Sequence, residues 1–429
     1  MYLPSLRSCS SWYSLQHFDP TSRLRLVCLA ILSPVEYDLC WLAWLMKTAW
    51  GGGANDIVSE LLGPFRFLVK FTLLDCSAKS KFLKVFTILL AVVIVVLLFA
   101  RVGLLMETKG NSLSFAWAES NFFGFPAIFA AVCSLCILGW TKNGFIPKFG
   151  KKLAHVRMLR VQSNMRLDGY RMIHVLAMIF SIPWLVAMMS WIVYNFTQSK
   201  IFYGAEETNI FFRVILVVSN FYVWYISTIV LAYYILVISA ITREVNYFNE
   251  ELQKAKQERL LKNIGVLEKF DFRQNQILEM ILLANGSLSS FGTFAPLFLF
   301  YGLVNGVYLT SFMGSVPLFY FAILMFNLAA IIVYNAFILF PTCGLQEQLS
   351  ETTKILINND EFECSKDPTV YQTYRIMVDR LHKVDTRISV IAAFPITRGV
   401  LAAACFITPN MGFLLVMAKK VLIANGGHV

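Results

Sequence analysis

The sequence is poor in charged residues. Asp, Glu, Lys and Arg together make up 15% of the 429 residues, whereas hydrophobic residues make up 57%. Soluble domains carry about 25% charged residues, and a soluble chain of this length needs them to cover two or three folded domains. Mean hydropathy is +0.63. The composition therefore excludes a soluble enzyme and a disordered chain, and it indicates a polytopic membrane protein.

Acidic residues are absent from the seven longest apolar runs. Each run is long enough to cross a hydrocarbon core, which takes roughly 17–25 helical residues. The predicted spans are 85–106, 122–141, 172–194, 211–241, 288–312, 316–340 and 392–418. Ion-coupled transporters usually need carboxylates inside the membrane, so their absence argues against proton or sodium coupling. Facilitated diffusion of a substrate stays open.

The sequence also lacks the residue clusters that catalysis, disulfides or metal binding require. None of the nine cysteines falls in a predicted outer loop, so no disulfide framework is expected. Cys133 and Cys136 form a CxxC pattern, but inside an apolar run they are small hydrophobic residues one helical turn apart. No zinc-ligand spacing occurs. We therefore expect no enzymatic activity, no cofactor and no metal.

Positive charge gathers on one side of the predicted topology. The net charge is +11, from 37 Lys and Arg against 26 Asp and Glu. With the N-terminus inside, thirty of the 37 basic residues fall in the inner segments and four in the outer ones. Cytoplasmic loops of membrane proteins collect Lys and Arg. The charge therefore predicts a cytoplasmic N-terminus and an extracellular C-terminus, and it does not indicate a nucleic-acid partner.

The predicted fold is all-α, and the membrane divides the chain. The divisions are a cytoplasmic N-terminal segment (1–84), spans one to four (85–241), a cytoplasmic helical loop (242–287), spans five and six (288–340), a cytoplasmic helical segment (341–391), and the last helix with a short outer tail (392–429). Span four is expected to continue into the cytoplasm as one helix, because no strong breaker precedes Gly265. Apolar stripes in the cytoplasmic segments indicate helices that pack on each other or on another subunit. Solvated helical loops are the alternative.

Polar-tipped aromatic side chains gather in the outer halves of three predicted spans. In span five, Tyr301, Asn305 and Tyr308 share one helix face. In span four, Asn220 and Trp224 share another. The candidate ligand-binding residues are Trp191, Tyr222, Tyr225, Tyr301, Asn305 and Tyr308. Such groups suit a pocket that binds a small molecule by stacking and hydrogen bonding. An aromatic belt at the membrane surface, or ordinary helix packing, gives the same pattern.

The last predicted span begins with Phe394 and Pro395, and it carries Arg398 about two turns inside. Small residues follow, which allow close approach between helices. One face of this helix carries the candidate pore-lining residues Ala404, Thr408, Met411 and Leu415. A pore helix in a symmetric oligomer, with apolar rings that gate by dewetting, has this pattern. Any well-packed helix has it too.

The predicted topology, with its long fourth helix and its helical segment before the last span, resembles the arthropod gustatory receptors of the seven-span insect-type chemoreceptor superfamily. The closest local resemblance runs over residues 371–416, where 388–401 is similar to the family's approach to its last helix. The family signature is Thr-Tyr, five apolar residues, then Gln-Phe. Thr408 matches the Thr, but Pro409 replaces the Tyr and the Gln-Phe pair is missing. The chain thus resembles a divergent member.

This resemblance implies a ligand-gated, non-selective cation channel in the plasma membrane, opened by a small-molecule tastant. It implies four identical or related subunits that meet through their cytoplasmic helices, each with its own pocket in the outer halves of its spans. Thr408, Met411 and Leu415 would then line a central pore. Lys419 and Lys420 would lie near its outer mouth, where four copies of the pair would repel cations.

Two other functions stay open at this point. A G-protein-coupled receptor also has seven spans, but its N-terminus is outside, and its outer Cys pair and late Asn-Pro-x-x-Tyr pattern do not occur in this sequence. A facilitative transporter needs no intramembrane acid and fits the composition as well.

Overall fold

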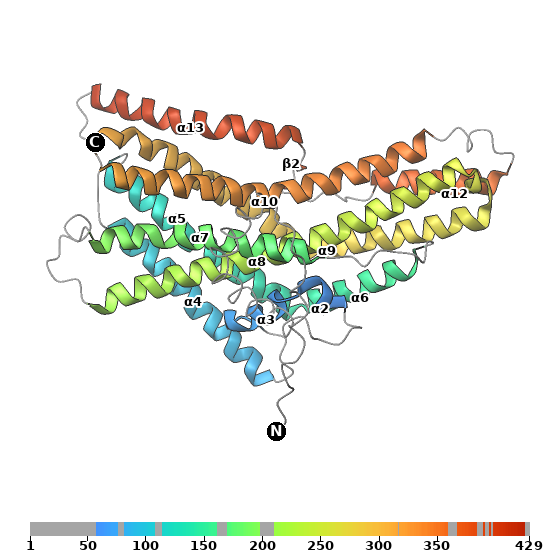
Figure 1. Ribbon diagram of the computed structural model, residues 1–429, viewed down its shortest axis with the longest axis horizontal. Coiled ribbons are helices and arrows are strands. Elements are labelled where there is room, and N and C mark those ends of the chain that lie inside the picture. The colour runs from blue at the N-terminus through green and yellow to red at the C-terminus, as the bar shows by residue number, and fades with distance from the viewer. Residues whose placement is uncertain are drawn as a thin grey trace, which may run out of the picture. The chain divides into compact units, whose positions relative to one another are not determined.

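The computed structural model describes residues 57–75, 81–107, 114–160, 170–197, 210–315, 317–358, 367–383, 389–390, 394–395 and 398–424. Most of the predicted N-terminal segment, residues 1–56, therefore lies outside the described residues. Almost all of the described residues are helical, as the sequence predicts (Figure 1).

The described elements follow one another with short connections. The first part of the chain holds α2 (Ile57–Leu62), α3 (Phe65–Leu68), the 3-10 turn η1 (Val69–Thr72), α4 (Lys81–Glu107), α5 (Phe115–Lys142), α6 (Phe145–Met158) and α7 (Arg171–Thr197). The second part holds α8 (Ile210–Gln257), η2 (Leu260–Lys262), α9 (Ile264–Leu309), η3 (Thr310–Ser315), α10 (Leu318–Ile357), α12 (Pro368–Lys383), the strands β1 (Ser389–Val390) and β2 (Phe394–Pro395), and α13 (Arg398–Ala424).

Six helices in the described part of the chain are long and apolar enough to cross a membrane. They are α4, α5, α7, α8, α9 and α10, and they cover the first six predicted spans except for two or three residues at the end of the fifth and the start of the sixth. The seventh predicted span, 392–418, corresponds to α13, which is not among the six. A seventh crossing, and the sides on which the termini lie, therefore stay predictions.

The last helix begins later than the sequence analysis places it. Residues Ser389–Val390 pair antiparallel with Phe394–Pro395, so the chain is extended where the prediction has helix. Proline also disfavours helical geometry in the residue before it. Arg398 is consequently the first residue of α13 and not a residue two turns inside it.

Three helices extend far beyond the thickness of a bilayer. At 1.5 Å per residue, the 48 residues of α8 span about 72 Å, against a hydrocarbon core of about 30 Å. The prediction that span four continues as one helix is confirmed. The chain then turns at Arg259, whose φ is 55°, and Asn263 caps α9 by accepting the backbone N–H of Gly265 at 3.0 Å. We call the end of the bundle from which α8, α9 and α10 continue the extended end.

At the extended end, the continuing helices pack on each other and on α12 (Figure 1). Arg380 of α12 donates to Asp271 of α9 at 2.9 Å. Arg273 of α9 donates to Glu251 of α8 at 2.6 Å, and these two side chains are 1% and 7% exposed. Packed helices were the predicted arrangement for this region. Besides α8, for which the sequence predicts it, α9 and α10 also run continuously from a span into this region.

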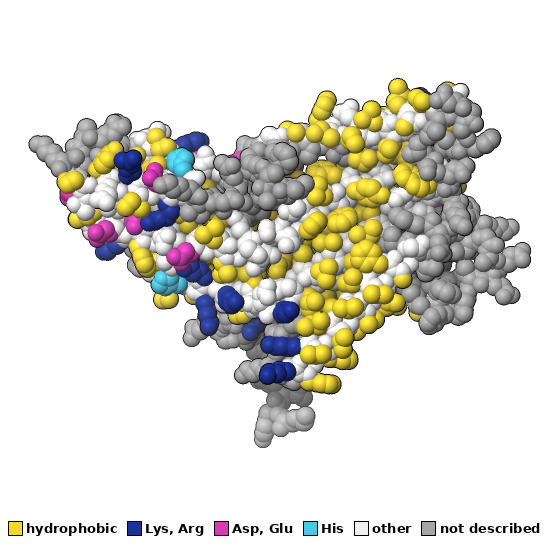
Figure 2. All heavy atoms as spheres, turned by 180° about the vertical axis from the view of Figure 1, so that it is seen from behind, with side chains coloured by type: hydrophobic (Ala, Val, Ile, Leu, Met, Phe, Trp, Pro, Cys, Tyr) yellow, Lys and Arg dark blue, Asp and Glu magenta, His cyan; other side chains and the backbone are white. Residues whose placement is uncertain are grey.

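The core of the bundle is aromatic, and several of its polar side chains hydrogen-bond between helices. Trp184 of α7 donates to the Ser227 hydroxyl of α8 at 2.8 Å. Tyr334 of α10 donates to the Ser227 carbonyl at 2.7 Å, and Tyr234 shares a 2.8 Å hydrogen bond with Thr342. Internal satisfaction of this kind is what a protein in a bilayer requires, because lipid offers no hydrogen bonds. The outward faces are apolar (Figure 2).

Candidate functional site

A pocket lies among four of the candidate spans, in the half of the bundle that faces away from the extended end. Its nine lining residues are Phe122, Phe123, Phe125 and Pro126 of α5, Ala187 and Met188 of α7, Asn220 of α8, and Asn327 and Ile331 of α10. Its cavity volume is about 10 Å³, which is about the room that one water molecule needs. A larger ligand would therefore enter only by displacing the lining side chains.

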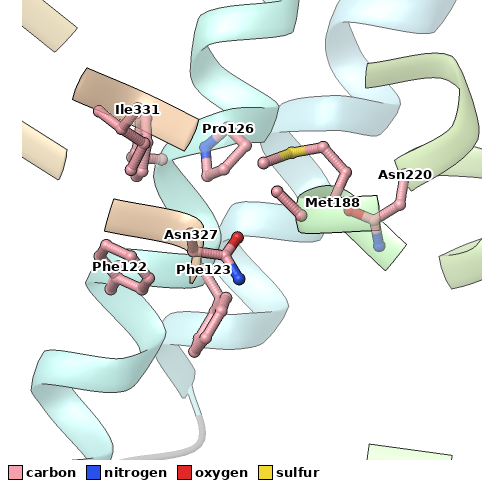
Figure 3. A pocket seen from close by; sticks show the side chains of 9 residues that line it. Phe122, Phe123, Pro126, Met188, Asn220, Asn327 and Ile331 are labelled. Carbon is pink, nitrogen blue, oxygen red and sulfur yellow. The ribbon is translucent and has the colours of Figure 1, made fainter. Parts of the chain in front are cut away.

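The lining is apolar except for two amides. Figure 3 shows Phe123, Met188 and Asn327 turned toward one space, which Asn220 reaches from α8. The Asn327 amide nitrogen donates to the Ile323 carbonyl at 2.9 Å and to the Ser190 hydroxyl at 3.2 Å. Its oxygen is therefore the group oriented to accept a hydrogen bond. The arrangement can bind a largely apolar molecule that carries a hydrogen-bond donor.

A buried carboxylate lies one helical turn beyond the pocket. Glu119 of α5 is 1% exposed, and it precedes Phe122 and Phe123 on the same side of the helix. The ring of Tyr320 packs on Phe123 and on Tyr194, with centroids 6.5 and 5.3 Å apart. The predicted span begins at residue 122, so the sequence analysis left Glu119 outside the membrane. The helix begins at Phe115 and buries it.

The three candidate residues on α9 do not line this pocket. The Tyr301 hydroxyl donates to Asn121 at 2.8 Å, and the Tyr301 side chain is 44% exposed. The buried Asn305 amide donates to the Tyr301 carbonyl at 2.9 Å. Tyr308 is fully buried, with Trp117 and Phe312 packed on its ring. These side chains join α9 to α5, and a role for them in ligand binding stays a prediction.

The two candidate tyrosines on α8 have hydroxyl groups that contact other parts of the fold. The Tyr222 hydroxyl lies 3.3 Å from that of Ser134, and the Tyr225 hydroxyl donates to the Leu68 carbonyl at 2.6 Å. The side chain of Trp191 lies outside the described residues. Asn220, which the sequence analysis placed with Trp224 on one face of span four, does line the pocket.

The candidate pore residues lie on a helix with one packed and one open face. Gly412 of α13 fits against α9 so closely that a Cβ there would come within 2.5 Å of Val307. Met411 is 47% exposed and Leu415 is half-buried. The backbones of Ala404 and Thr408 belong to the same helix, but their side chains lie outside the described residues, as do those of Phe394, Pro395 and Arg398.

The lysines that follow the predicted pore differ in their surroundings. The Lys419 ammonium lies 3.2 Å from the ring centroid of Phe312, over its face, whereas Lys420 is exposed. A cation over an aromatic face is held by the ring quadrupole. One member of the lysine pair therefore points toward η3 of its own chain, which halves the charge that could face the predicted central axis.

The described residues hold no group of three or more His, Cys, Asp or Glu side chains that could bind a metal ion. Cys133 and Cys136 are free and buried in α5, in agreement with their interpretation as small hydrophobic residues.

Known proteins share the fold but little of the sequence. The insect olfactory receptor OR5 from Machilis hrabei superimposes with a TM-score of 0.56 at 11% identity, covering 85% of this chain and 100% of that one. The same receptor in complex with eugenol gives a TM-score of 0.52 at 12% identity, with the same coverage. The chain therefore shares the fold of this olfactory receptor, while the gustatory assignment stays a prediction.

Sequence comparison gives a family but no characterised relative. No curated protein sequence matches the chain significantly. The model of one family, described as Caenorhabditis protein of unknown function, DUF267, matches residues 61–412. Because the match spans most of its length, the chain belongs to the DUF267 family of Caenorhabditis proteins.

Proposed function

We propose that this chain is a subunit of a ligand-gated cation channel, and that a small molecule opens it by binding in the pocket between α5, α7, α8 and α10. The observation that carries the proposal is this pocket, which four candidate spans enclose within a fold that covers the whole of an insect olfactory receptor. The resemblance found in the sequence implies the channel activity.

The chemistry of the pocket limits the ligand. Three phenylalanines, a methionine and an isoleucine favour a flat or compact apolar body, and the Asn327 oxygen accepts one hydrogen bond. No Lys or Arg is among the lining residues, all of which the structure describes. The ligand is therefore a neutral molecule with a hydroxyl or N–H donor. Eugenol, which the related receptor binds in its complex, has this chemistry and is a suitable first probe.

The last helix supplies the pore in this proposal. One face of α13 packs on α9 through Gly412, and beside this face Met411 is 47% exposed. An apolar helix with an open face is suited to meet its copies around an axis. The assembly is a homo- or heterotetramer of related subunits in the plasma membrane, with α13 as the seventh span, the N-terminus cytoplasmic and the C-terminus outside. The ligand is a tastant, the activity is not enzymatic, and no nucleic acid takes part.

Whole-cell recording tests the proposal. The full chain is expressed in cells with G-protein signalling blocked, and eugenol and related neutral phenols are applied. We expect ligand-evoked cation current, labelling of a C-terminal tag on intact cells and no labelling of an N-terminal tag. A current that disappears when G proteins are blocked would point to the G-protein-coupled receptor. Uptake of a labelled substrate without current would point to the transporter.

A further inference from the structure

Residues 57–75, which contain α2, α3 and η1, are bound to the bundle through their backbone. Four of their carbonyl oxygens hydrogen-bond to side chains of three different candidate spans. The pairs are Leu61 with His174 of α7 at 2.8 Å, Phe65 with Tyr233 of α8 at 3.5 Å, Leu68 with Tyr225 of α8 at 2.6 Å, and Leu74 with Thr141 of α5 at 3.0 Å. The segment is thus an integral part of the fold.

These partners give the depth of the segment in the bundle. Thr141 lies in the last turn of α5 and His174 in the first turn of α7, both at the extended end. The ring of Tyr233 stacks on Trp140, so it lies at the same level. Tyr225 precedes Tyr233 by eight residues of helix, which is about 12 Å farther from the extended end. The chain therefore runs about 12 Å into the bundle and returns, and we call residues 57–75 the re-entrant segment.

The outward face of the re-entrant segment combines aromatic rings with cations. Phe67 and Phe71 are 56% and 59% exposed, and their rings pack edge to face at 4.9 Å. Arg66 and Lys70 are exposed beside them. Arg66 also donates to the hydroxyl of Ser59, which holds its guanidinium against the segment. Cations among apolar groups at membrane depth are costly unless an anion or water meets them.

The neighbouring start of α4 continues the same chemistry. Lys81 and Lys84 are exposed there, with Phe82 between them 79% exposed. Figure 2 shows Lys and Arg side chains gathered along the edge of the apolar surface. A surface that alternates exposed apolar rings with cations matches the boundary between acyl chains and acidic headgroups.

We propose that the re-entrant segment binds an anionic phospholipid from the leaflet at the extended end. The headgroup phosphate, and any headgroup carboxylate, pair with Arg66 and Lys70, and the acyl chains pack on Phe67 and Phe71. The site is separate from the small-molecule pocket, so its occupancy does not depend on the identity of the tastant.

Lipid binding to the purified full-length chain tests this proposal. Native mass spectrometry from nanodiscs that contain phosphatidylserine and phosphatidylcholine measures the preference for the acidic lipid. Each charge-assisted hydrogen bond to the headgroup contributes roughly a ten-fold preference, so the double variant Arg66→Gln, Lys70→Gln should lower it by about 100-fold. The matched control is Lys148→Gln, Lys151→Gln, which removes two exposed charges from α6 at the same end; it should retain the wild-type preference.

Further measurements separate lipid recognition from misfolding. Lys70→Arg preserves the charge and should bind phosphatidylserine as the wild type does. Thermal unfolding in detergent should be the same for the double variant and the control, because the four carbonyl hydrogen bonds remain. An unchanged preference in a folded double variant would overturn the proposal. An equal loss of phosphatidylserine preference in the α6 control would also overturn the proposal, because the acidic lipid would then be attracted by positive charge in general and not by this site.

Discussion

Substitution of Gly306 tests whether the close packing of α9 on Phe122 determines the shape of the ligand pocket. A Cβ at this position would lie 2.4 Å from Leu328 and 2.7 Å from the ring of Phe122, whereas carbon atoms pack best at about 3.5–4.0 Å. Each neighbour must therefore retreat by roughly 1 Å. Phe122 lines the pocket, and a ring that moves away from α9 enters this cavity of about 10 Å³.

The magnitude follows from two opposing effects. Overpacking a core costs about 1–3 kcal/mol, and alanine regains about 0.5–1 kcal/mol relative to glycine inside a helix. The net cost of Gly306→Ala is thus about 0.5–2 kcal/mol. If ligand binding requires the wild-type position of Phe122, the half-activating ligand concentration should rise by about 2- to 30-fold.

Concentration–response curves and thermal unfolding in detergent measure the two consequences of Gly306→Ala separately. Gly286→Ala is the matched control, because Gly286 lies on the same helix with nothing within 4 Å of its Cβ position. It should leave the response unchanged and stability equal or higher. The reasoning is refuted if the two variants give the same curve, since contact with Phe122 would then have no influence on the pocket.

Three further substitutions address the charge pair, the pocket and the pore. Arg273→Met leaves the buried Glu251 carboxylate without its arginine. This variant should lower the free energy of unfolding by about 3–5 kcal/mol, measured by thermal denaturation. Adding Glu251→Leu should restore most of the lost stability. Asn327→Leu should weaken activation by ligands with a hydroxyl about tenfold and leave activation by analogues without a donor unchanged. Met411→Cys should let a charged thiol reagent block the open channel, whereas Phe413→Cys on the other flank of α13 should not; equal block of both would contradict the proposed pore face.

The long helices and the spans follow from patterns that the sequence displays directly. An acid-free run such as 211–241 has one stable conformation in lipid, and the absence of a breaker before Gly265 carries the helix onward. The sequence places the start of the last helix too early because residues 392–395 are apolar enough to extend a span, yet Phe394 and Pro395 form β2 and pair with β1. Hydropathy does not distinguish an apolar strand pair from the first turns of a helix.

The pocket could not be derived in the same way. Phe122, Met188 and Ile331 have the composition of ordinary core residues, and only the relative rotation of α5, α7 and α10 turns them toward one space. The polar-tipped aromatics of the sequence prediction do not line this pocket, because a buried hydroxyl needs a partner and readily finds one in helix packing. Tyr225 illustrates this, since its hydroxyl is bonded to the Leu68 carbonyl of the re-entrant segment.

The position of α9 suggests how the pocket and the last helix communicate. Gly302 and Gly306 admit the rings of Phe125 and Phe122 so closely that a Cβ would overlap them. On its other side, α9 receives Gly412 of α13 at Val307, one residue beyond Gly306. Neither contact has room for a further atom, and closely packed interfaces transmit a displacement instead of absorbing it. In the proposed channel, a ligand that moves the phenylalanine rings acts on α9, and a movement of α9 changes its contact with α13.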